Sequence, residues 1–261
     1  MARFAGKAVL VSGAAGGFGR EIARAFAAEG ARLILTDREA GPLETFAAEI
    51  TGTEAVTVAG DVSSEATAAA LVETAVERFG GLDVAINNAG IVHDYKRLQE
   101  ITAAEAERVI AVDLMGVFFA MKHQIAAMSA RFARDGTRGA IVNVASVAGL
   151  GGAPLLSVYA AAKHGVVGLT KSAAAENARR GLRINAVCPS FARTAMVLGE
   201  PGSLAGGAEA GEAEQAIVRG IPMRRLAEVG EVVTAVLFAA DPANGFMTGA
   251  AIPVDGGLSA I

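Results

Sequence analysis

The segment KAVLVSGAAGGFG at residues 7–19 decides how the start of the chain folds. Its first half is an uninterrupted apolar run, which is typical of a strand buried on both faces of a sheet. Its second half places Gly13, Gly17 and Gly19 before a segment of helical period. Backbone N–H groups at such a turn, next to the positive end of a helix, bind a pyrophosphate without a side chain in the way. The turn therefore predicts a dinucleotide site, although a tight turn without a ligand uses glycines in the same way.

The rest of the chain alternates short apolar runs with longer segments of helical period. This alternation predicts a parallel sheet with helices on both faces, and the right-handed crossover rule favours a doubly wound, Rossmann-type α/β fold. We expect seven strands, at residues 7–12, 32–36, 55–59, 83–87, 140–145, 183–187 and 251–254. We expect helices at about 19–29, 42–50, 65–79, 103–132, 157–179 and 228–239.

No linker-like stretch divides the sequence, so we predict one domain over residues 1–261. The stretch at about 191–220 differs from the remainder because it is rich in Gly, Ala and Glu. We interpret it as a mobile loop over the substrate site, although an ordinary surface loop has the same composition.

The composition excludes several classes of protein. Of the 261 residues, 52% are hydrophobic, which is enough for a sizeable core and excludes disorder. A net charge of −4 without a basic run makes nucleic acid and anionic membranes poor partners. One cysteine, Cys188, and three scattered histidines exclude a disulfide framework and predict no metal site. The N-terminus does not resemble a signal peptide, and no uncharged run approaches a membrane span of about 18 residues, so we expect a cytoplasmic protein.

Two acidic residues at strand ends bear on the cofactor. Asp37 follows the second strand, where a carboxylate accepts hydrogen bonds from ribose hydroxyls and repels a 2′-phosphate. It favours NAD over NADP, although the adjacent Arg38 is able to pair with a phosphate. Asp61, with Val62 after it, ends the third strand, where its side chain either reaches the adenine amino group or caps the next helix.

A second group of polar residues points to acid–base chemistry. Tyr159 and Lys163 lie four residues apart in YAAAK and share one helical face, and Ser146 lies just upstream at the end of the fifth strand. A neighbouring ammonium lowers the pKa of a phenol from about 10, so Tyr159 would exchange a proton with an alcohol or ketone oxygen that Ser146 also binds. Taken by itself, Tyr-x-x-x-Lys is equally typical of a pair on a helix surface.

Together these motifs resemble the short-chain dehydrogenase/reductase family, in its single-domain branch of NAD(P)-dependent alcohol dehydrogenases and ketoreductases. The resemblance covers essentially the whole chain. It implies catalytic roles for Ser146, Tyr159 and Lys163. It also implies a homotetramer, with interfaces formed by the helices at 103–132 and 157–179 and by the C-terminal strand. It rests on Ser12–Gly19, Asn87–Gly90, Ser146, Tyr159-x-x-x-Lys163, Pro189–Ser190 and Asp255–Gly257. The cofactor contacts expected from the motifs and the resemblance are Gly13, Gly17, Phe18, Gly19, Asp37, Arg38, Asp61, Val62, Asn88, Ala89, Gly90, Tyr159, Lys163, Pro189 and Thr194.

One catalytic position departs from the family pattern. The family usually has an asparagine in the long helix, where it holds a kink whose backbone carbonyl binds a relay water, and this chain has Asp113 there. We expect Asp113 to keep that catalytic relay role. An ionised Asp113 would also place a negative charge toward Lys163 and alter the pH dependence of proton transfer.

The predicted function is reversible hydride transfer between NAD and a neutral, moderately apolar secondary alcohol or ketone, cyclic substrates included. The expected substrate contacts are His93, Tyr95, Leu155, Phe191 and Met196. One alternative is an NADPH-dependent ketoreductase of the 3-oxoacyl-acyl-carrier-protein type, in which Arg38 or Arg20 would hold the 2′-phosphate. Another is a dinucleotide-sensing binding protein that has lost catalysis.

Overall fold

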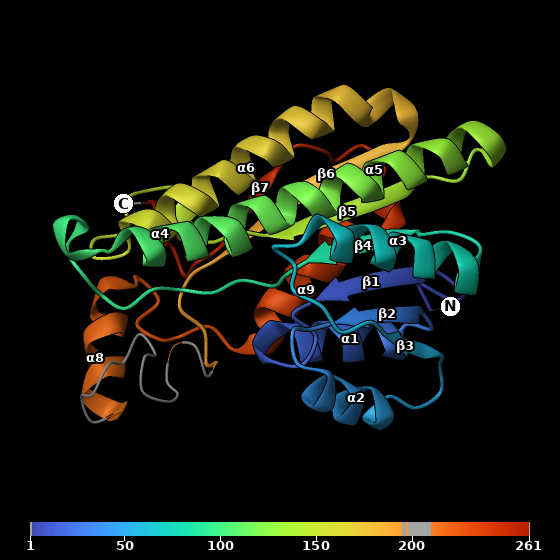
Figure 1. Cartoon of the computed structure of the whole chain (residues 1–261). Helices are drawn as coiled ribbons and strands as arrows, with labels where there is room; N and C mark the ends of the chain where they lie inside the picture. The colour runs from blue at the N-terminus through green and yellow to red at the C-terminus, as the bar shows by residue number, and fades with distance from the viewer. Residues whose placement is uncertain (1, 195–196, 198–209, 261) are drawn as a thin grey trace.

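A single twisted sheet organises the molecule (Figure 1). The computed structural model describes residues 2–194, 197 and 210–260 of the 261-residue chain. Within them seven parallel strands run in the order β3-β2-β1-β4-β5-β6-β7, which confirms the predicted doubly wound fold. The strands are β1 (Ala8–Ser12), β2 (Arg32–Thr36), β3 (Ala55–Thr57), β4 (Val84–Asn87), β5 (Gly139–Val144), β6 (Leu182–Pro189) and β7 (Ala251–Val254). The strand order reverses between β1 and β4, where folds of this class open a crevice at the carboxyl ends.

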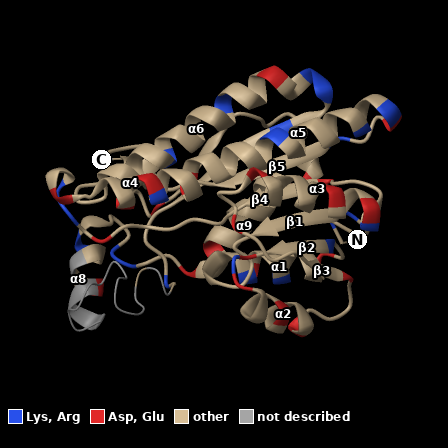
Figure 2. Ribbon diagram, viewed as in Figure 1, with Lys and Arg blue, Asp and Glu red and all other residues tan. Residues whose placement is uncertain are grey.

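Helices cover both faces of this sheet. One face packs against α1, α2 and α9, and the other packs against α3, α5 and α6. The helices are α1 (Gly17–Ala28), α2 (Ala40–Glu49), α3 (Glu65–Phe79), α4 (Ala103–Ile110), α5 (Gly116–Asp135), α6 (Ser157–Asn177), α8 (Ala210–Gly220) and α9 (Val229–Ala240). In the ribbon of Figure 2, acidic and basic residues are interspersed along these helices.

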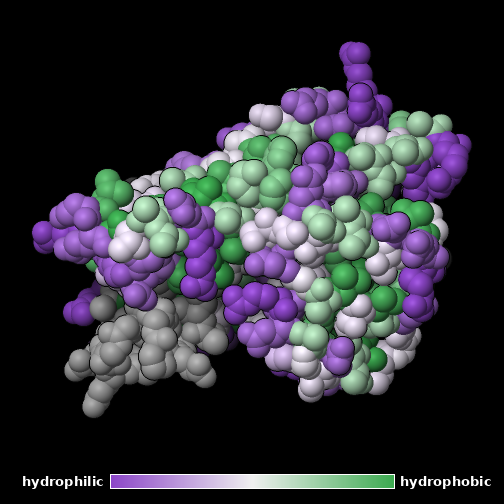
Figure 3. Space-filling model, viewed as in Figure 1, coloured by the Kyte–Doolittle hydropathy of each residue, from purple (hydrophilic) through white to green (hydrophobic). Residues whose placement is uncertain are grey.

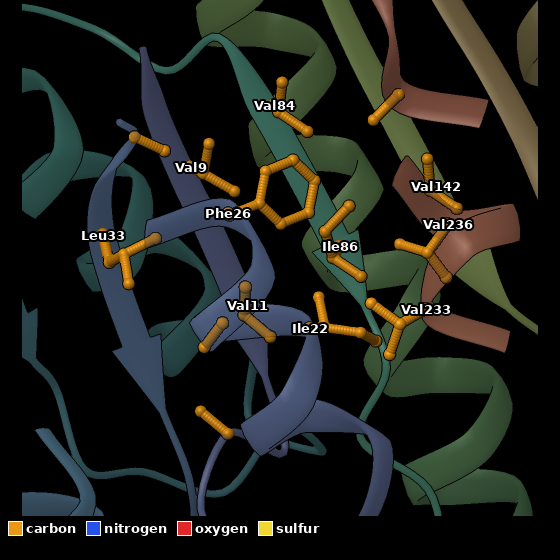
Figure 4. Close-up of a cluster of buried hydrophobic side chains, with 14 of the residues drawn as sticks. Val9, Val11, Ile22, Phe26, Leu33, Val84, Ile86, Val142, Val233 and Val236 are labelled. Atoms are coloured by element: carbon orange, nitrogen blue, oxygen red, sulfur yellow. The ribbon is translucent and has the colours of Figure 1, made fainter. Parts of the chain in front are cut away.

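The two cores divide the residues of each strand by their alternation. In β1, Val9 and Val11 point to the core under α1 and α9, whereas Ala8 and Leu10 point to the core under α3, α5 and α6. Because both faces are covered, every residue of β1 is buried and the strand shows no polar alternation. Figure 4 shows the first core, in which side chains of β1, β2, β4 and β5 meet Ile22 and Phe26 of α1 and Val233 and Val236 of α9.

The predicted helix at 103–132 is in fact two helices in one rod. A π-helical turn, Ala111–Met115, joins α4 to α5, and a turn of this kind often accompanies a functional site. The rod Ala103–Asp135 is long and apolar enough to cross a membrane by length and composition. It packs against α3, α6 and the sheet with Val117, Met121 and Met128 buried, so it is a core helix of this fold.

The stretch at 191–220 contains a helix that was not predicted. α8 lies apart from the sheet, on the side toward which the arrows of β1 and β2 point (Figure 1). Part of the expected loop, residues 195–196 and 198–209, lies outside the described residues. A small cluster of Val197, Ile221 and Leu226 forms here, against Phe191, Ile217 and Val218.

The C-terminal turn is joined to the segment after α8. Asp255 accepts hydrogen bonds from the backbone N–H groups of Gly257, at 3.0 Å, and Ser259, at 2.8 Å. The backbone N–H of Met223 donates to the carbonyl of Gly256 at 3.1 Å. Gly256 has a φ of +63°, and a Cβ there would lie 2.7 Å from Ile221, so a larger residue would disturb this junction.

Candidate active site

A cleft of about 1200 Å³ opens at the carboxyl ends of the strands. Residues that follow each strand from β1 to β7 line it, so its walls come from segments far apart in the sequence. This is the edge where an α/β sheet with reversed strand order binds its ligand. Its size exceeds the range of about 300–1,000 Å³ that is typical of small-molecule pockets, which suits an extended ligand together with a second molecule.

The glycine-rich turn after β1 forms one end of the cleft. Gly13 and Gly17 have φ values of +66° and +45°, a backbone region that glycine adopts without strain. A Cβ at Gly13 would lie 2.9 Å from Asn88, whereas a Cβ at Gly16 or Gly17 would meet nothing within 4 Å. Gly16 and Gly17 both line the cleft, so the turn offers an open backbone cradle that fits a pyrophosphate.

Hydrogen bonds fix this turn to the end of β4. The Ser12 hydroxyl accepts the backbone N–H groups of Asn88 and Ala89, at 3.0 and 3.1 Å. The Asn88 side-chain amide donates to the carbonyl of Ser12 at 2.9 Å. Gly19 was predicted to contact the cofactor, but it does not line the cleft. Its Cα faces the turn itself, and a Cβ there would lie 1.9 Å from the carbonyl oxygen of Gly13. Its role is close packing of helix against turn.

Asp37 stands at the cleft edge with its carboxylate already oriented. Its two oxygens accept the backbone N–H groups of Ala15, at 2.9 Å, and Arg38, at 2.8 Å. The Arg38 guanidinium is exposed and lies 3.4 Å from Glu39. The wall here therefore presents a carboxylate, which suits a ribose hydroxyl better than a phosphate.

Arg20, the other residue considered for a 2′-phosphate, is directed elsewhere. Its guanidinium lies 2.8 Å from Glu49 and 4.8 Å from the ring centroid of Phe46, and it does not line the cleft.

Asp61 lines the cleft near Asp37 and forms a turn of its own. One of its oxygens accepts both the backbone N–H of Ser63, at 2.9 Å, and the Ser63 hydroxyl, at 2.7 Å. These bonds hold the pKa of Asp61 below its usual value. Asp61 does not cap α3, whose N-cap is Ser64; its carboxylate orders the turn before the helix, and the residue lines the cleft, where the expected adenine contact stays a prediction.

Ser146, Tyr159 and Lys163 all line the cleft. Ser146 follows β5, and its hydroxyl accepts the backbone N–H of Ala148 at 3.1 Å. Tyr159 lies in the first turn of α6, and Lys163 lies one turn further on the same face, with its Nζ 5.4 Å from the Tyr159 ring centroid. The Lys163 Nζ also donates to the carbonyl of Val144 at 3.3 Å. The chain thus brings together the three residues in which a phenol, a hydroxyl and an ammonium were predicted to cooperate.

The π turn directs Asp113 into the same wall. One carboxylate oxygen accepts the backbone N–H of Ile91 at 2.8 Å, and the other lies 3.2 Å from the Lys163 Nζ. The side chain of Asp113 is 0% exposed and that of Lys163 is 4% exposed, so the two form a buried ion pair.

The pKa of Tyr159 differs from the expectation. Burial raises this pKa above its usual value, and Asp113 raises it further, whereas Lys163 and the Ser146 hydroxyl lower it. The contribution of Lys163 has the predicted direction, but the net shift is upward, because desolvation disfavours the phenolate and Asp113 opposes the lysine. For Lys163 itself, burial lowers the pKa, and Asp113 and Tyr159 outweigh that effect and raise it.

The five residues predicted to contact the substrate lie in different places relative to the cleft. Tyr95 and Phe191 line the cleft, and Met196 lies outside the described residues. His93 is buried behind the wall, with its Nδ1 2.7 Å from the carbonyl of Asp94. Leu155 has a φ of +67° and an exposed side chain and does not line the cleft, whereas its neighbour Leu156 does.

The sequence analysis missed several residues of the cleft wall. Leu258 and Ser259 of the C-terminal turn line the cleft. The motif Asp255–Gly257, directly before them in the sequence, is the feature that marks this turn. Arg108 on α4 also lines it, and nothing in the sequence pattern distinguishes this arginine. The other predicted cofactor contacts do line the cleft: Gly13, Gly17, Phe18, Asp37, Arg38, Asp61, Val62, Asn88, Ala89, Gly90, Tyr159, Lys163, Pro189 and Thr194.

Comparison with known proteins matches the chain over almost its full length. The family model described as "Enoyl-(Acyl carrier protein) reductase" matches residues 13–259. Levodione reductase of Leifsonia aquatica is 38% identical over 99% of this chain and 96% of that protein. Cis-4-hydroxycyclohexanecarboxylate dehydrogenase of Sinomonas cyclohexanicum is 39% identical over 99% of this chain and 98% of that protein.

Solved structures agree with the sequence relatives. The crystal structure of levodione reductase has a TM-score of 0.92 and 37% identity, and covers 99% of each chain. That of 3-ketoacyl-(acyl-carrier-protein) reductase from Brucella melitensis, complexed with NADH, has a TM-score of 0.88 and 33% identity, and covers 98% of this chain and 99% of the other. Together with the cleft that gathers Ser146, Tyr159 and Lys163, these matches show that the chain belongs to the short-chain dehydrogenase/reductase family, among the oxidoreductases that act on alcohols and ketones.

Proposed function

We propose that this chain is an NAD-dependent oxidoreductase that transfers a hydride between nicotinamide and a neutral, moderately apolar secondary alcohol or ketone. One observation carries the proposal: Ser146, Tyr159 and Lys163 share a cleft with the glycine turn and with Asp37. A phosphate cradle and a proton donor in a single cavity are what dinucleotide-dependent alcohol chemistry requires of a protein.

The side chains divide the chemistry among them. A bound nicotinamide supplies the hydride acceptor or donor at its C4 atom. Tyr159 gives its hydroxyl proton to the ketone oxygen in reduction and takes the alcohol proton in oxidation. Ser146 donates its O–H to the same substrate oxygen, since its own oxygen is oriented by the N–H of Ala148. Lys163 carries the positive charge that favours phenolate formation during oxidation.

The preference for NAD rests on charge at the ribose end. The Asp37 carboxylate lines the cleft there, and a 2′-phosphate on the ribose would face it at close range. Arg20 is paired with Glu49 and lies outside the cleft, whereas Arg38 lines the cleft and has only an exposed contact, at 3.4 Å, with Glu39. The relative of known structure that was crystallised with NADH is consistent with this preference.

The substrate wall favours a neutral ring or chain. The described residues between Ser146 and α6, with those of the loops that directly follow β4 and β6, form an uncharged part of the wall. They are Tyr95, Leu150, Ala153, Pro154, Leu156, Phe191 and Val197. Arg108 of α4 is a charged residue that also lines the cleft. The name of one relative, cis-4-hydroxycyclohexanecarboxylate dehydrogenase, supports cyclic alcohols as the first substrates to test, both with and without a carboxylate.

The test is a screen of secondary alcohols with NAD and of the matching ketones with NADH, followed by NADH absorbance. Open-chain and cyclic members are compared at equal concentration, each with NADP and NADPH as the cofactor control. Tyr159→Phe removes the exchangeable proton, so we expect kcat to fall by about 10²–10⁴-fold while NADH still binds with unchanged fluorescence enhancement. Activity near the wild-type level in this variant would contradict the proposal, as would turnover with NADPH alone.

A homotetramer is the assembly that we propose for the enzyme. Figure 3 shows hydrophobic residues exposed along the side formed by α4, α5 and α6. Phe118 of α5 is 41% exposed there, and Phe246, shortly before β7, is fully exposed. Exposed aromatic side chains at two separate places support two interfaces between copies of this chain.

A further inference from the structure

The buried pair of Asp113 and Lys163 changes the charge that Tyr159 experiences. The Asp113 carboxylate lies 3.2 Å from the Lys163 Nζ, and neither side chain is more than 4% exposed. A Cβ at Gly90 would lie 3.2 Å from both the Asp113 Oδ2 and the Lys163 Nζ, so the backbone of the cofactor wall closes over the pair. Water therefore screens this pair poorly, and its charges act strongly on their neighbours.

The groups that face Tyr159 come from three elements. Lys163 approaches from α6, Asp113 from the π turn and Ser146 from the end of β5. Behind Lys163 lies Cys188 of β6, whose thiol stays neutral because burial raises its pKa to about 11. The formal charges near the phenol are thus one ammonium and one carboxylate, which balance.

A carboxylate in this position has a defined effect on the phenol. An unpaired ammonium beside a tyrosine favours the phenolate, whereas a carboxylate against that ammonium opposes it. Burial raises the pKa of Asp113 above its usual value, whereas the Lys163 ammonium and the N–H of Ile91 act to lower it. These two partners, at 2.8 and 3.2 Å, offset part of the cost of burying the carboxylate, and the charge of Asp113 is what the experiments below test.

We propose that Asp113 is a positioning residue that balances the charge of Lys163 and so keeps Tyr159 protonated at neutral pH, in the form that donates a proton to a ketone oxygen. The transfer of that proton to a ketone rests on the proposed function, whereas the ionisation of Tyr159 does not. In reduction the carbonyl carbon receives a hydride from nicotinamide, the carbonyl oxygen receives the phenolic proton, and water later returns a proton to the phenolate. In oxidation the phenolate must exist first, so this direction requires alkaline pH.

The first experiment measures Tyr159 without any turnover. The chain has two tyrosines and no tryptophan, so in the Tyr95→Phe background the tyrosinate absorbance comes from Tyr159 alone. Asp113→Asn keeps the shape and an oxygen acceptor for Ile91 and removes the charge. We expect it to lower the midpoint of the Tyr159 titration by about one pH unit or more, the usual effect of one charge at this range. Far-UV circular dichroism at each pH verifies that the protein is still folded where the tyrosinate absorbance is measured.

Two matched variants control this titration. Glu107→Gln removes a carboxylate from the exposed face of α4, six residues before Asp113, and should leave the midpoint unchanged. Tyr159→Phe in the same background should abolish the transition, which assigns it. If Asp113→Asn and its parent titrate alike, or if neither ionises while folded, Asp113 is a neutral acid and the inference is wrong.

The second experiment follows kcat/KM against pH in both directions. In the parent chain, oxidation should rise toward alkaline pH, and reduction should hold constant through neutral pH. In Asp113→Asn the midpoint of the oxidation limb should move to lower pH by the same amount as the titration midpoint, while the ratio of oxidation to reduction at each pH stays fixed by the equilibrium of the reaction. A shifted titration without turnover in either chain would overturn the proposed function and leave the charge balance standing, whereas turnover with unshifted profiles would overturn the charge balance alone.

Discussion

Asp37 is held at the cleft by two backbone N–H groups rather than by a cation. Its charge is therefore not neutralised by a neighbour, and it remains available to repel a phosphate or accept hydroxyl protons. Hydrogen bonds to a charged acceptor contribute about 1.5–3 kcal/mol each, which corresponds to roughly a tenfold to hundredfold change in affinity. This single side chain should accordingly decide which dinucleotide the chain prefers.

The prediction at this scale concerns Asp37→Ser. We expect kcat/KM for NAD to fall by about tenfold to a hundredfold, and the ratio of NADP to NAD efficiency to rise, since the repulsion is removed together with the acceptor. Steady-state kinetics with both cofactors measures the ratio. Glu44→Gln, an exposed carboxylate on α2, serves as the control and should leave the ratio unchanged. An unchanged ratio in Asp37→Ser would mean that other groups select the cofactor.

Arg183 connects two elements at the opposite edge of the sheet. From β6 its guanidinium donates to the carbonyls of Ala239 and Ala240, at 2.8 and 2.9 Å, and of Asp241 at 3.1 Å. These carbonyls belong to the end of α9, where backbone acceptors have no partner within the helix. The planar guanidinium satisfies several of them at once and complements the negative end of the helix.

We therefore predict that Arg183→Met lowers the free energy of unfolding by about 2 kcal/mol, because partly buried carbonyls lose charged donors. Arg183→Lys should recover only part of the loss, since an ammonium is a compact donor that cannot span the same set of carbonyls. Urea unfolding followed by far-UV circular dichroism measures both. A Met variant as stable as the parent chain would show that these hydrogen bonds contribute nothing, and equal losses in the Met and Lys variants would show that a charge alone recovers nothing.

The elements differ in how far sequence alone predicts them. The strands were predicted within two residues at each end. β1, β4 and β5 are buried throughout, and burial on both faces produces apolar runs that are easy to detect, whereas the edge strands β3 and β7 are only partly buried. The π turn at Ala111–Met115 was missed, although the resemblance implied a kink there, because its residues are compatible with a regular helix. α8 was missed because its apolar face is short and lies within a Gly- and Ala-rich stretch.

The residues of the candidate site also differ in how far the sequence alone predicts them. Ser146, Tyr159 and Lys163 follow from spacing and from the resemblance. Leu155, predicted as a substrate contact, does not line the cleft, and its neighbour Leu156 does; no motif marks the positive φ of Leu155 in the sequence. The direction of the Tyr159 pKa shift also could not be predicted from sequence. It depends on whether the rise caused by burial exceeds the decrease caused by the Lys163 ammonium.

At the scale of the whole molecule, two sets of exposed aromatic residues remain to be explained. Phe118 projects from α5, beside Met115, which is 37% exposed. Phe246 and Phe238, the latter 49% exposed, lie near β7 and on α9, at another part of the surface. A tetramer built on two-fold axes uses two different self-complementary surfaces, each of which buries a residue against its own copy.

This geometry predicts that Phe118→Glu and Phe246→Glu each convert the tetramer to a dimer, and that the double variant is a monomer. Each substitution places two like charges together at a two-fold interface and costs the desolvation of both. Sedimentation velocity measures the species directly. Val76→Glu on α3, a residue 47% exposed outside both surfaces, is the control and should remain tetrameric. A monomeric parent chain would contradict the assembly, whereas a tetramer that survives both substitutions would place its interfaces on other surfaces.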